Sequence, residues 1–406
     1  MDGDRFDVVI IGGGIVGLAV AMAFTERFPR LRLAVLEKED RVAAHQSGHN
    51  SGVIHSGLYY RPGSVKAKLC VEGAAAMVEF CREHGIRCEK CGKVVVATGE
   101  EEIPALEELY RRGSANGVAN LALIGPERLR EIEPASRGLR ALHVPGAGIT
   151  DYAAVTRRYA EIVRSRGGEV RVGTRVTGFR TQGAERVLET TAGAVSARYI
   201  INCAGLYSDR LAGLAGARLE SMIVPFRGEY YELAAERQHL VKGLIYPVPD
   251  PRFPFLGVHF TRRIGGGVEA GPNAVLALRR EGYRKTDLHL AEALGMLAFP
   301  GFWRMVGRYW RTGLGEFYRS LNRRAFLLDL QRLVPELRLE DLRRGGAGVR
   351  AQAVDRNGRL VDDFHFVRTE GMIHVQNVPS PAATASIPIG RAIVAMATQA
   401  FDLGQS

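Results

Sequence analysis

The chain has few cysteines and no long hydrophobic run. No stretch of about 18 consecutive apolar residues occurs among its 406 residues, so a membrane-spanning helix is not expected. No basic segment leads into an apolar one at the N-terminus, where Val8–Ile11 runs directly into glycines as a strand would. The five cysteines indicate no disulfide framework, so we expect a reduced, cytoplasmic protein.

Metal and nucleic-acid signatures are also missing. Cys88 and Cys91 form a C-x-x-C pair, but no second pair or H-x-x-x-H partner follows, so plain thiols are favoured over a metal or redox site and no metal is predicted. The net charge is +11, which suits an acidic small substrate, an anionic membrane surface or nucleic acid. Nucleic acid is disfavoured because the basic residues are scattered and no nucleic-acid-binding module is present.

Glycine, by contrast, is abundant, and its placement near the N-terminus predicts a nucleotide site. Phe6–Ile11 is an apolar run typical of a buried strand, residues 15–28 have helical spacing, and Leu31–Leu36 is a second strand. A G-x-G-x-x-G motif joins the first strand to the helix, and an acidic residue ends the second. The glycines permit a tight turn, backbone approach to a pyrophosphate and close helix packing, while the helix N-terminus attracts phosphate. The predicted contacts are Gly12, Gly14, Ile15, Val16, Gly17, Glu37 and Lys38.

The rest of the pattern predicts an α/β protein. It is a Rossmann-type nucleotide-binding domain interleaved with a smaller substrate domain, built on an antiparallel or mixed sheet with helices. Glu169–Val176 is expected to be one strand, Phe255–Thr261 another, and residues 286–334 mostly helical. The final strand and helix resemble the first domain. The expected division is 1–88, 148–222 and 344–406 for the nucleotide-binding domain, and 89–147 and 223–343 for the substrate domain.

A polar, glycine-punctuated loop, His45–Gly57, follows the acidic residue and favours FAD over NAD. A plain NAD domain would resume helix and strand here, whereas flavoproteins run such a loop beneath the cofactor. Ser47, Asn50 and Ser51 offer short hydrogen-bonding groups to phosphate and ring. An ordinary surface loop is the alternative.

From this loop onward the chain resembles the L-2-hydroxyglutarate dehydrogenase/oxidase family, a branch of the D-amino-acid-oxidase-like FAD enzymes. The matching stretches are HQSGHNSGVIHSGLYY (His45–Tyr60), PFRGEYYEL (Pro225–Leu233), HFTR (His259–Arg262), GPNA (Gly271–Ala274), GVRAQ (Gly348–Gln352) and HVQNVPSPAATAS (His374–Ser386). The resemblance implies oxidation of L-2-hydroxyglutarate to 2-oxoglutarate with FAD reduced, and electrons passed to a quinone or to oxygen.

The same resemblance implies the remaining cofactor contacts. These are Ser47, His49, Asn50, Ser51 and Gly52 in the flavin loop, Val176 at the adenine, and Ala204, Gly205, Ser380, Pro381, Ala382, Ala383 and Thr384 in later flavin-contacting segments. HQS stands where the family pattern leads us to expect HQT, a swap of one hydroxyl for another. FAD is expected to be non-covalent because no cysteine lies near the C-terminal flavin segment.

Flavin carries the hydride chemistry, so the protein must handle one proton and two carboxylates. A neutral histidine is the natural base near pH 7. His55, at the end of the flavin loop, is the first candidate and His259 the second; each has the alternative of a purely structural histidine. His374, at the start of a buried strand, is expected to be structural.

Arginine suits a carboxylate, and Arg350 resembles the arginine that anchors the α-carboxylate in this group of oxidases. A plain surface arginine is the alternative. Arg61, Lys66 and Arg262 are candidates for the distal carboxylate. The expected pocket walls are Tyr59, Tyr60, Tyr230, Tyr231, Thr261 and Asn273.

The stretch Gly301–Arg324 mixes both tryptophans with six arginines, which is typical of an amphipathic segment at a membrane surface; helices with a solvated basic face are the alternative. Peripheral contact with an anionic membrane is therefore a hypothesis. Two rival functions stay open. One is a flavin oxidoreductase acting on an amino acid or another 2-hydroxy acid, and the other is a flavin-binding protein without turnover that serves in redox sensing or at a membrane.

Overall fold

The computed structural model describes residues 4–183, 185–249 and 256–403. Strand β1 (Arg5–Ile11) leads through the glycine turn into helix α1 (Ile15–Arg27), and strand β2 (Leu33–Leu36) pairs with β1 in parallel. β2 is fully buried, as expected for a strand covered on both faces of a parallel sheet. The predicted βαβ unit is confirmed.

This unit lies within an eight-stranded sheet of the described residues. Its main path runs β10-β11-β12-β1-β2-β9, and β20 joins β12 in parallel and carries β19. The β10–β11 and β11–β12 pairs are antiparallel. The further strands are β9 (Glu169–Arg171), β10 (Val176–Gln182), β11 (Glu185–Thr190), β12 (Gly193–Asn202), β19 (His365–Thr369) and β20 (Met372–Asn377).

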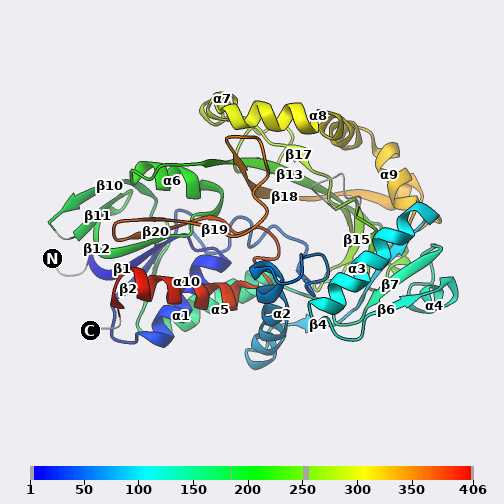
Figure 1. The fold of residues 1–406 in the computed structure, drawn as a ribbon, viewed down its shortest axis with the longest axis horizontal. Helices are drawn as coiled ribbons and strands as arrows, with labels where there is room; N and C mark the ends of the chain where they lie inside the picture. The colour runs from blue at the N-terminus through cyan, green and yellow to red at the C-terminus, as the bar shows by residue number, and fades with distance from the viewer. Residues whose placement is uncertain (1–3, 184, 250–255, 404–406) are drawn as a thin grey trace.

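Helices cover both faces of this sheet (Figure 1). α1 packs against α5 (Tyr152–Ser165) and α10 (Ser386–Ala400), and α10 also contacts α2 (Val65–Glu83). Their apolar sides form the largest buried cluster of the described residues with the strands. The short helix α6 (Ser208–Leu214) lies on the opposite face, near Leu188 and Ile200.

A second, nine-stranded sheet forms the other half of the molecule within the described residues. Its order is β17-β13-β16-β15-β14-β5-β7-β6, and β18 pairs with β13 along almost their whole length. The strands are β5 (Lys93–Ala97), β6 (Ala122–Ile124), β7 (Arg140–Val144), β13 (Ser221–Leu233), β14 (Leu244–Pro247), β15 (His259–Arg262), β16 (Val268–Gly271), β17 (Val275–Leu276) and β18 (Leu342–Asp355).

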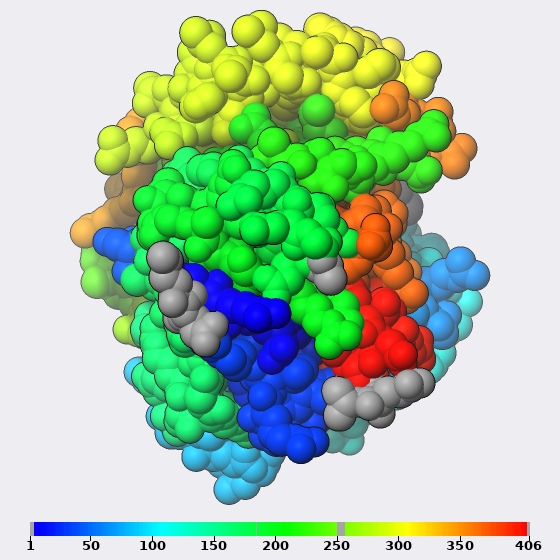
Figure 2. All heavy atoms as spheres, turned by 90° about the vertical axis from the view of Figure 1, so that its left-hand side faces the viewer, coloured from blue at the N-terminus to red at the C-terminus, as the bar shows by residue number. Residues whose placement is uncertain are grey.

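Smaller elements complete the fold. A separate three-stranded sheet has the order β3-β8-β4. Its strands are β3 (Val53–Ile54), β8 (Gly148–Thr150) and β4 (Cys88–Glu89). Helices α7 (Leu290–Leu297) and α8 (Pro300–Leu321) lie across the outer edge of the second sheet, far from α1 (Figures 1 and 2). The remaining helices are α3 (Ile103–Ala115), α4 (Pro126–Ile132) and α9 (Arg323–Gln331). No helix among the described residues is long and apolar enough to span a membrane.

The chain enters the two large sheets alternately. Strands of the first sheet come from residues 5–36, 169–202 and 365–377, and strands of the second from 93–144, 221–276 and 342–355. The predicted interleaved α/β architecture is therefore confirmed. The division proposed at residue 344 falls inside β18, which belongs to the second sheet.

Some strand predictions were wrong. Glu169–Val176 is not one strand, because the chain bends after Arg171 and Val176 begins β10 in a different part of the sheet. β15 begins at His259, and Phe255 of the predicted Phe255–Thr261 strand lies outside the described residues. β18 was missed because its glycines and arginines give no apolar alternation; its pairing with β13 determines its conformation.

Close backbone packing at Gly17 gives a direct test of the nucleotide half. A Cβ added at Gly17 would lie 2.1 Å from the carbonyl oxygen of Gly12. We expect Gly17→Ala to lower the free energy of unfolding by about 1–3 kcal/mol and to reduce bound cofactor, because α1 must shift away from the turn. Thermal unfolding and the absorbance spectrum measure both effects. Gly146→Ala is the control, since no atom lies within 4 Å of a Cβ there, and equal behaviour of the two variants would contradict the packing argument.

Candidate active site and cofactor groove

A cavity of about 400 Å³ opens at the carboxyl ends of β1, β2, β12 and β20. Ligands of open α/β sheets bind at this edge. Of the predicted contacts, thirteen line it: Gly12, Gly14, Ile15, Val16, Glu37, Lys38, Ser47, Asn50, Val176, Ala204, Gly205, Ala382 and Ala383. We refer to this cavity as the cofactor groove.

The glycine turn forms one wall of the groove. Gly12 has φ +114°, and a Cβ there would lie 2.5 Å from the carbonyl oxygen of Cys203, so only glycine fits. Gly14 precedes α1 in an extended conformation and leaves its surface open toward the groove. Gly17 does not line the groove; it allows α1 to pack on the turn. Gly12 and Gly17 thus have the turn and packing roles that the motif predicts, and the approach of Gly14 to a pyrophosphate stays a prediction.

Glu37 is held in place beside the turn. Its carboxylate accepts hydrogen bonds from the backbone N–H groups of Gly13 (2.7 Å) and Glu39 (2.9 Å). Each carboxylate oxygen has a second lone pair, so Glu37 can still accept from ribose hydroxyls. Val176 and Lys38 line the same end of the groove.

The flavin loop divides into residues that face the groove and residues that brace it. The Ser47 hydroxyl accepts from the N–H of Ile15 (2.8 Å), at the N-terminus of α1, and Asn50 bonds the loop carbonyl of Ser47 (2.8 Å). His49 does not line the groove, because its ring stacks on Tyr283 at 4.3 Å. Ser51 and Gly52 also lie off the groove, with the Gly52 carbonyl accepting from Thr150.

The C-terminal segment is similarly divided. Ala382 and Ala383 line the groove, whereas Ser380, Pro381 and Thr384 do not. Thr384 is buried: its hydroxyl lies 2.8 Å from that of Tyr152 and accepts from the N–H of His55 at 3.1 Å. Thr384 therefore positions the backbone that carries His55.

The sequence analysis did not predict several residues that line the groove, among them Ala43 and Ala44. The side chains that could have been identified from sequence are Gln46, which stands inside the quoted loop, and Gln376 and Asn377, which stand inside HVQN. The others missed are Ile11, Leu36, His45, Thr174, Arg175, Cys203, Leu206, Tyr207, Arg210, Leu211, Leu214, Ala351, Val375 and Val378. The turn, the fixed acid and the groove together fit a dinucleotide of FAD's form, for which Gly14 and Ser47 could hold phosphate and Glu37 ribose.

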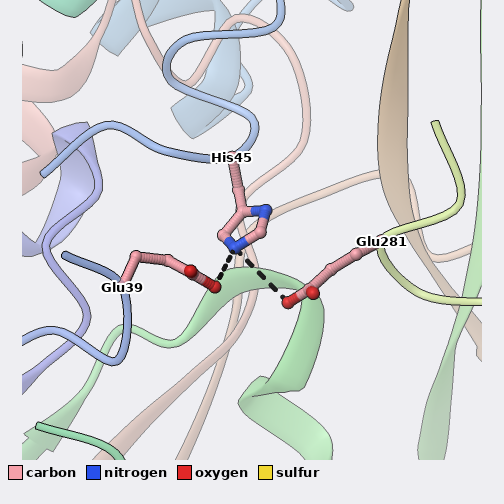
Figure 3. A group of neighbouring side chains, drawn as sticks. All are labelled: Glu39, His45 and Glu281. Carbon is pink, nitrogen blue, oxygen red and sulfur yellow. Dashed lines mark hydrogen bonds and ion pairs between the residues drawn. The ribbon is translucent and has the colours of Figure 1, made fainter. Parts of the chain in front are cut away.

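Beside the groove, Glu39, His45 and Glu281 place metal-type donor atoms within 4.8 Å of one another. Figure 3 shows the His45 ring between the two carboxylates, with Nε2 2.9 Å from Glu39 and 3.3 Å from Glu281. The Lys38 ammonium contacts all three side chains, so a cation is already supplied by the chain. Its hydrogen bond lowers the pKa of Glu39 to about 2. This ion-pair hub ties the end of β2 to residues 277–289.

The second sheet presents a set of polar side chains on one face. Paired residues of neighbouring strands point the same way. Lys93 of β5 pairs with Leu244 of β14, which pairs with Thr261 of β15; Tyr246 and His259 lie two residues along on the same face. The Tyr246 and His259 rings stack at 3.8 Å. Four polar residues from three strands, Lys93, Tyr246, His259 and Thr261, thus share one face.

His55 approaches this face from the flavin loop. The charges of Lys93 and His259 both act on it, and burial with these charges lowers the pKa of His55 to about 3. Burial likewise lowers the pKa of His259 to about 3. Four buried atoms here have no hydrogen-bond partner within the described chain: Nδ1 of His55 and the hydroxyls of Ser56, Tyr59 and Thr261. Unpaired buried polar atoms on facing elements are expected where a polar substrate binds.

Arg350 of β18 adds a second cation near the cluster. The charge of Arg350 contributes to the lowered pKa of His259. Burial raises the pKa of Tyr230 to about 12, and the charge of Arg350 partly offsets that rise. Tyr59 and Thr261 are also brought to the cluster. Asn273 is not: its side-chain oxygen accepts from the N–H of Glu229 and its amide donates to the Glu229 carboxylate. Tyr231 is not either, since it packs on Phe326 in the core.

None of the three predicted cations for a distal carboxylate is available. Arg61 is exposed, Lys66 donates to Asp362 at 3.1 Å, and Arg262 pairs with Glu89 at 2.8 Å. The sequence analysis did not predict Lys93, although a lysine at the start of the apolar strand KVVVA is an unusual place for a charge. His374 is structural as expected: it is fully buried, with Nδ1 3.2 Å from Asn202 and Nε2 3.2 Å from Thr369.

Comparison with known proteins decides the family. The profile described as FAD dependent oxidoreductase matches residues 7–396. An L-2-hydroxyglutarate dehydrogenase of Indibacter alkaliphilus is 51% identical, with 98% of this chain and 100% of that protein covered. The chain belongs to the L-2-hydroxyglutarate dehydrogenase family of FAD-dependent oxidoreductases. FAD is its cofactor, and it is an oxidoreductase of the kind that acts on a 2-hydroxy acid.

Further relatives come from a bacterium and from an animal, and a solved structure has a similar fold. The L-2-hydroxyglutarate dehydrogenase of Escherichia coli K12 is 47% identical over 96% of the chain and 92% of its own length, and the mitochondrial protein of Homo sapiens is 46% identical over 98% and 90%. The L-alpha-glycerophosphate oxidase of Mycoplasma pneumoniae, solved with FAD, has a TM-score of 0.79 at 22% identity, covering 96% of this chain and 94% of that one.

Proposed function

We propose that this protein oxidises L-2-hydroxyglutarate to 2-oxoglutarate. FAD, when bound, supplies a two-electron acceptor for the hydride that leaves the substrate carbon. The observation that carries the proposal is the cluster of two neutral histidines with two cations, Lys93 and Arg350, close enough for their charges to act on it. Such a cluster accepts one proton and holds anions, as a 2-hydroxy dicarboxylate requires.

The base is one of the two histidines. Nδ1 of His259 lies 2.9 Å from the carbonyl oxygen of Gly257, so in the neutral ring the Nδ1 proton is donated there and Nε2 carries the lone pair. His55 has its Nδ1 buried and unpaired, ready for a substrate hydroxyl. Either ring can take the hydroxyl proton as the hydride leaves, and the other then orients the substrate.

An amine substrate fits this cluster less well. The charged groups around the histidines are Lys93, Lys66 and Arg350, all cationic, and they would repel an ammonium group. Glu269, which pairs with Thr261 across the sheet, forms an ion pair with Arg263. This arrangement favours a hydroxy acid over an amino acid, the substrate type of the structurally similar glycine oxidase of Geobacillus kaustophilus (TM-score 0.70, 19% identity, 98% of this chain and 95% of that chain covered).

Anaerobic reduction of the bound flavin tests the reaction directly. We expect L-2-hydroxyglutarate to bleach the visible flavin absorption in a single turnover, and glycine, lactate and the D-isomer to do so far more slowly. Stopped-flow absorbance measures each rate. Efficient bleaching by an amino acid would replace the proposal with an amine oxidation, and no bleaching by any of these compounds would favour a flavin protein without turnover.

The lowered histidine pKa values predict the pH dependence. A base with a pKa of about 3 is neutral, and therefore competent, at every pH above that value. The profile of kcat/KM should then stay flat from pH 7 down to pH 5, without the fall near 6.5 that an exposed histidine would give. A fall centred near 6.5 would contradict the assignment.

Variants of the two histidines distinguish their roles. Replacing the base with alanine should slow flavin reduction by about 10²- to 10⁴-fold while FAD stays bound, because the proton then lacks its acceptor. His55→Ala and His259→Ala are compared by stopped-flow reduction at saturating substrate, and His239→Ala, an exposed histidine distant in the fold, is the control. If neither variant slows reduction, neither histidine is the base.

For the electron acceptor we propose a membrane quinone, reached by docking on an anionic bilayer. Helices α7 and α8 carry exposed apolar side chains at helical spacing, and their mutual alignment makes one outer ridge (Figure 2). Exposed arginines flank the ridge and match the charge of anionic headgroups. The apolar residues are Leu290, Leu294, Leu297, Trp303, Trp310, Leu314, Phe317 and Leu321, and the arginines are Arg304, Arg308, Arg311, Arg323 and Arg324.

Co-sedimentation with vesicles tests the docking. We expect binding to vesicles containing phosphatidylglycerol at low salt, weaker binding to pure phosphatidylcholine, and loss of binding in the triple variant Trp310→Ser, Leu314→Ser, Phe317→Ser, because both apolar insertion and charge contribute. Leu139→Ser, at an exposed leucine elsewhere, is the control. Unchanged sedimentation of the triple variant would exclude the ridge, and oxygen would then be the acceptor to examine.

A further inference from the structure

Lys93 is a buried cation without an acidic partner. Its side chain is 2% exposed at the start of β5. The ammonium lies over the rings of Tyr246 (4.4 Å to the centroid) and Tyr59 (5.1 Å), and no carboxylate of the described residues pairs with it. Burying a charge without a counter-charge is costly, so a lysine in this position indicates an anion that binds there.

The location of Lys93 identifies which anion. Tyr246 stacks on His259, and the Lys93 ammonium lies over the same tyrosine ring. The charges of Lys93 and Arg350 both act on His259. A ligand held at the histidines therefore has two cations near it. The other cations near the flavin loop are taken: Lys66 by Asp362 and Arg262 by Glu89.

We propose that Lys93 binds the distal carboxylate of the substrate and is the residue that selects dicarboxylates over monocarboxylic 2-hydroxy acids. This inference rests on the proposed function and deepens it. Arg350 then holds the carboxylate next to the reacting carbon, and the two histidines lie between. A monocarboxylate would leave the ammonium buried and unpaired, so the site rejects it by the cost of that charge.

The surroundings of Lys93 also make its charge adjustable. Burial lowers its pKa to about 8, and a bound carboxylate would raise the pKa by restoring a counter-charge. A lysine is charged below its pKa, so dicarboxylate affinity should be full at pH 7 and fall as the pH rises above about 8. The titratable groups that face this position are Tyr59, Tyr246, Cys70, Cys91, His55 and His259.

The test uses the holoenzyme with two ligands that it cannot oxidise. Glutarate carries both carboxylates, and butyrate lacks the distal one. Titrations followed by the flavin difference spectrum and by calorimetry should give wild-type protein a preference for glutarate on the order of 10²-fold. Lys93→Met removes the charge while keeping the length and should abolish that preference. Lys68→Met, at an exposed lysine of α2, should keep it.

Turnover gives a second readout that a merely structural lysine would not change. In Lys93→Met, kcat/KM for L-2-hydroxyglutarate should fall about 10²-fold, mainly through KM, while kcat/KM for L-2-hydroxybutyrate should stay or rise. Glutarate should raise the thermal unfolding temperature of wild type and not of the variant. If Lys93→Met does not fold, Lys93→Gln replaces it, and the loss of glutarate affinity above pH 8 in wild type is measured independently.

The outcomes separate this inference from the function on which it rests. If wild type oxidises L-2-hydroxyglutarate but Lys93→Met keeps the glutarate preference, Lys93 does not bind the distal carboxylate. If wild type prefers glutarate through Lys93 but does not oxidise L-2-hydroxyglutarate, the dicarboxylate site stands and the reaction is wrong. A preference that survives in both variants overturns the proposal.

Discussion

The parallel pairing of β5 with β14 is the constraint on which the active site depends. It joins residues about 150 positions apart and places Lys93 beside Tyr246, on the face that meets the flavin loop. Side chains alternate between the faces of a strand, so a slip of one residue would turn Lys93 into the apolar core on the other side. Val94 and Ile245 of the same strands occupy that core, which fixes the register.

The two halves of the molecule build their candidate sites from different groups: backbone atoms in one half and side chains in the other. The nucleotide half relies on backbone: glycines that admit close carbonyls, N–H groups at a helix start, and carboxylate Glu37 held by two N–H groups. The substrate half relies on side chains gathered from four strands and the flavin loop. Thr384 connects them, because its buried hydroxyl contacts both Tyr152 and the backbone of His55. One buried hydroxyl thereby links α5 to the loop that carries His55.

Sequence reasoning succeeded where the chemistry is local. The turn around Gly12 and the loop at Ser47 are contiguous, so the required geometry is visible in a few residues. It failed where tertiary pairing decides. Asn273 looked suited to a pocket, yet its amide braces Glu229. Lys93 stands before an apolar run, and only the sheet register reveals that its charge has no partner.

Helix α8 is fastened to the substrate half, not appended to it. Its inner side packs Phe302 and Met305 against Val354 of β18, four residues from Arg350, and the hydroxyl of Ser320 donates to Glu229 of β13. The outer ridge therefore packs directly on the strand that carries Arg350. A bilayer that holds the ridge would also fix the tilt of the whole molecule, so the direction from which substrate enters would be set by the geometry of adsorption.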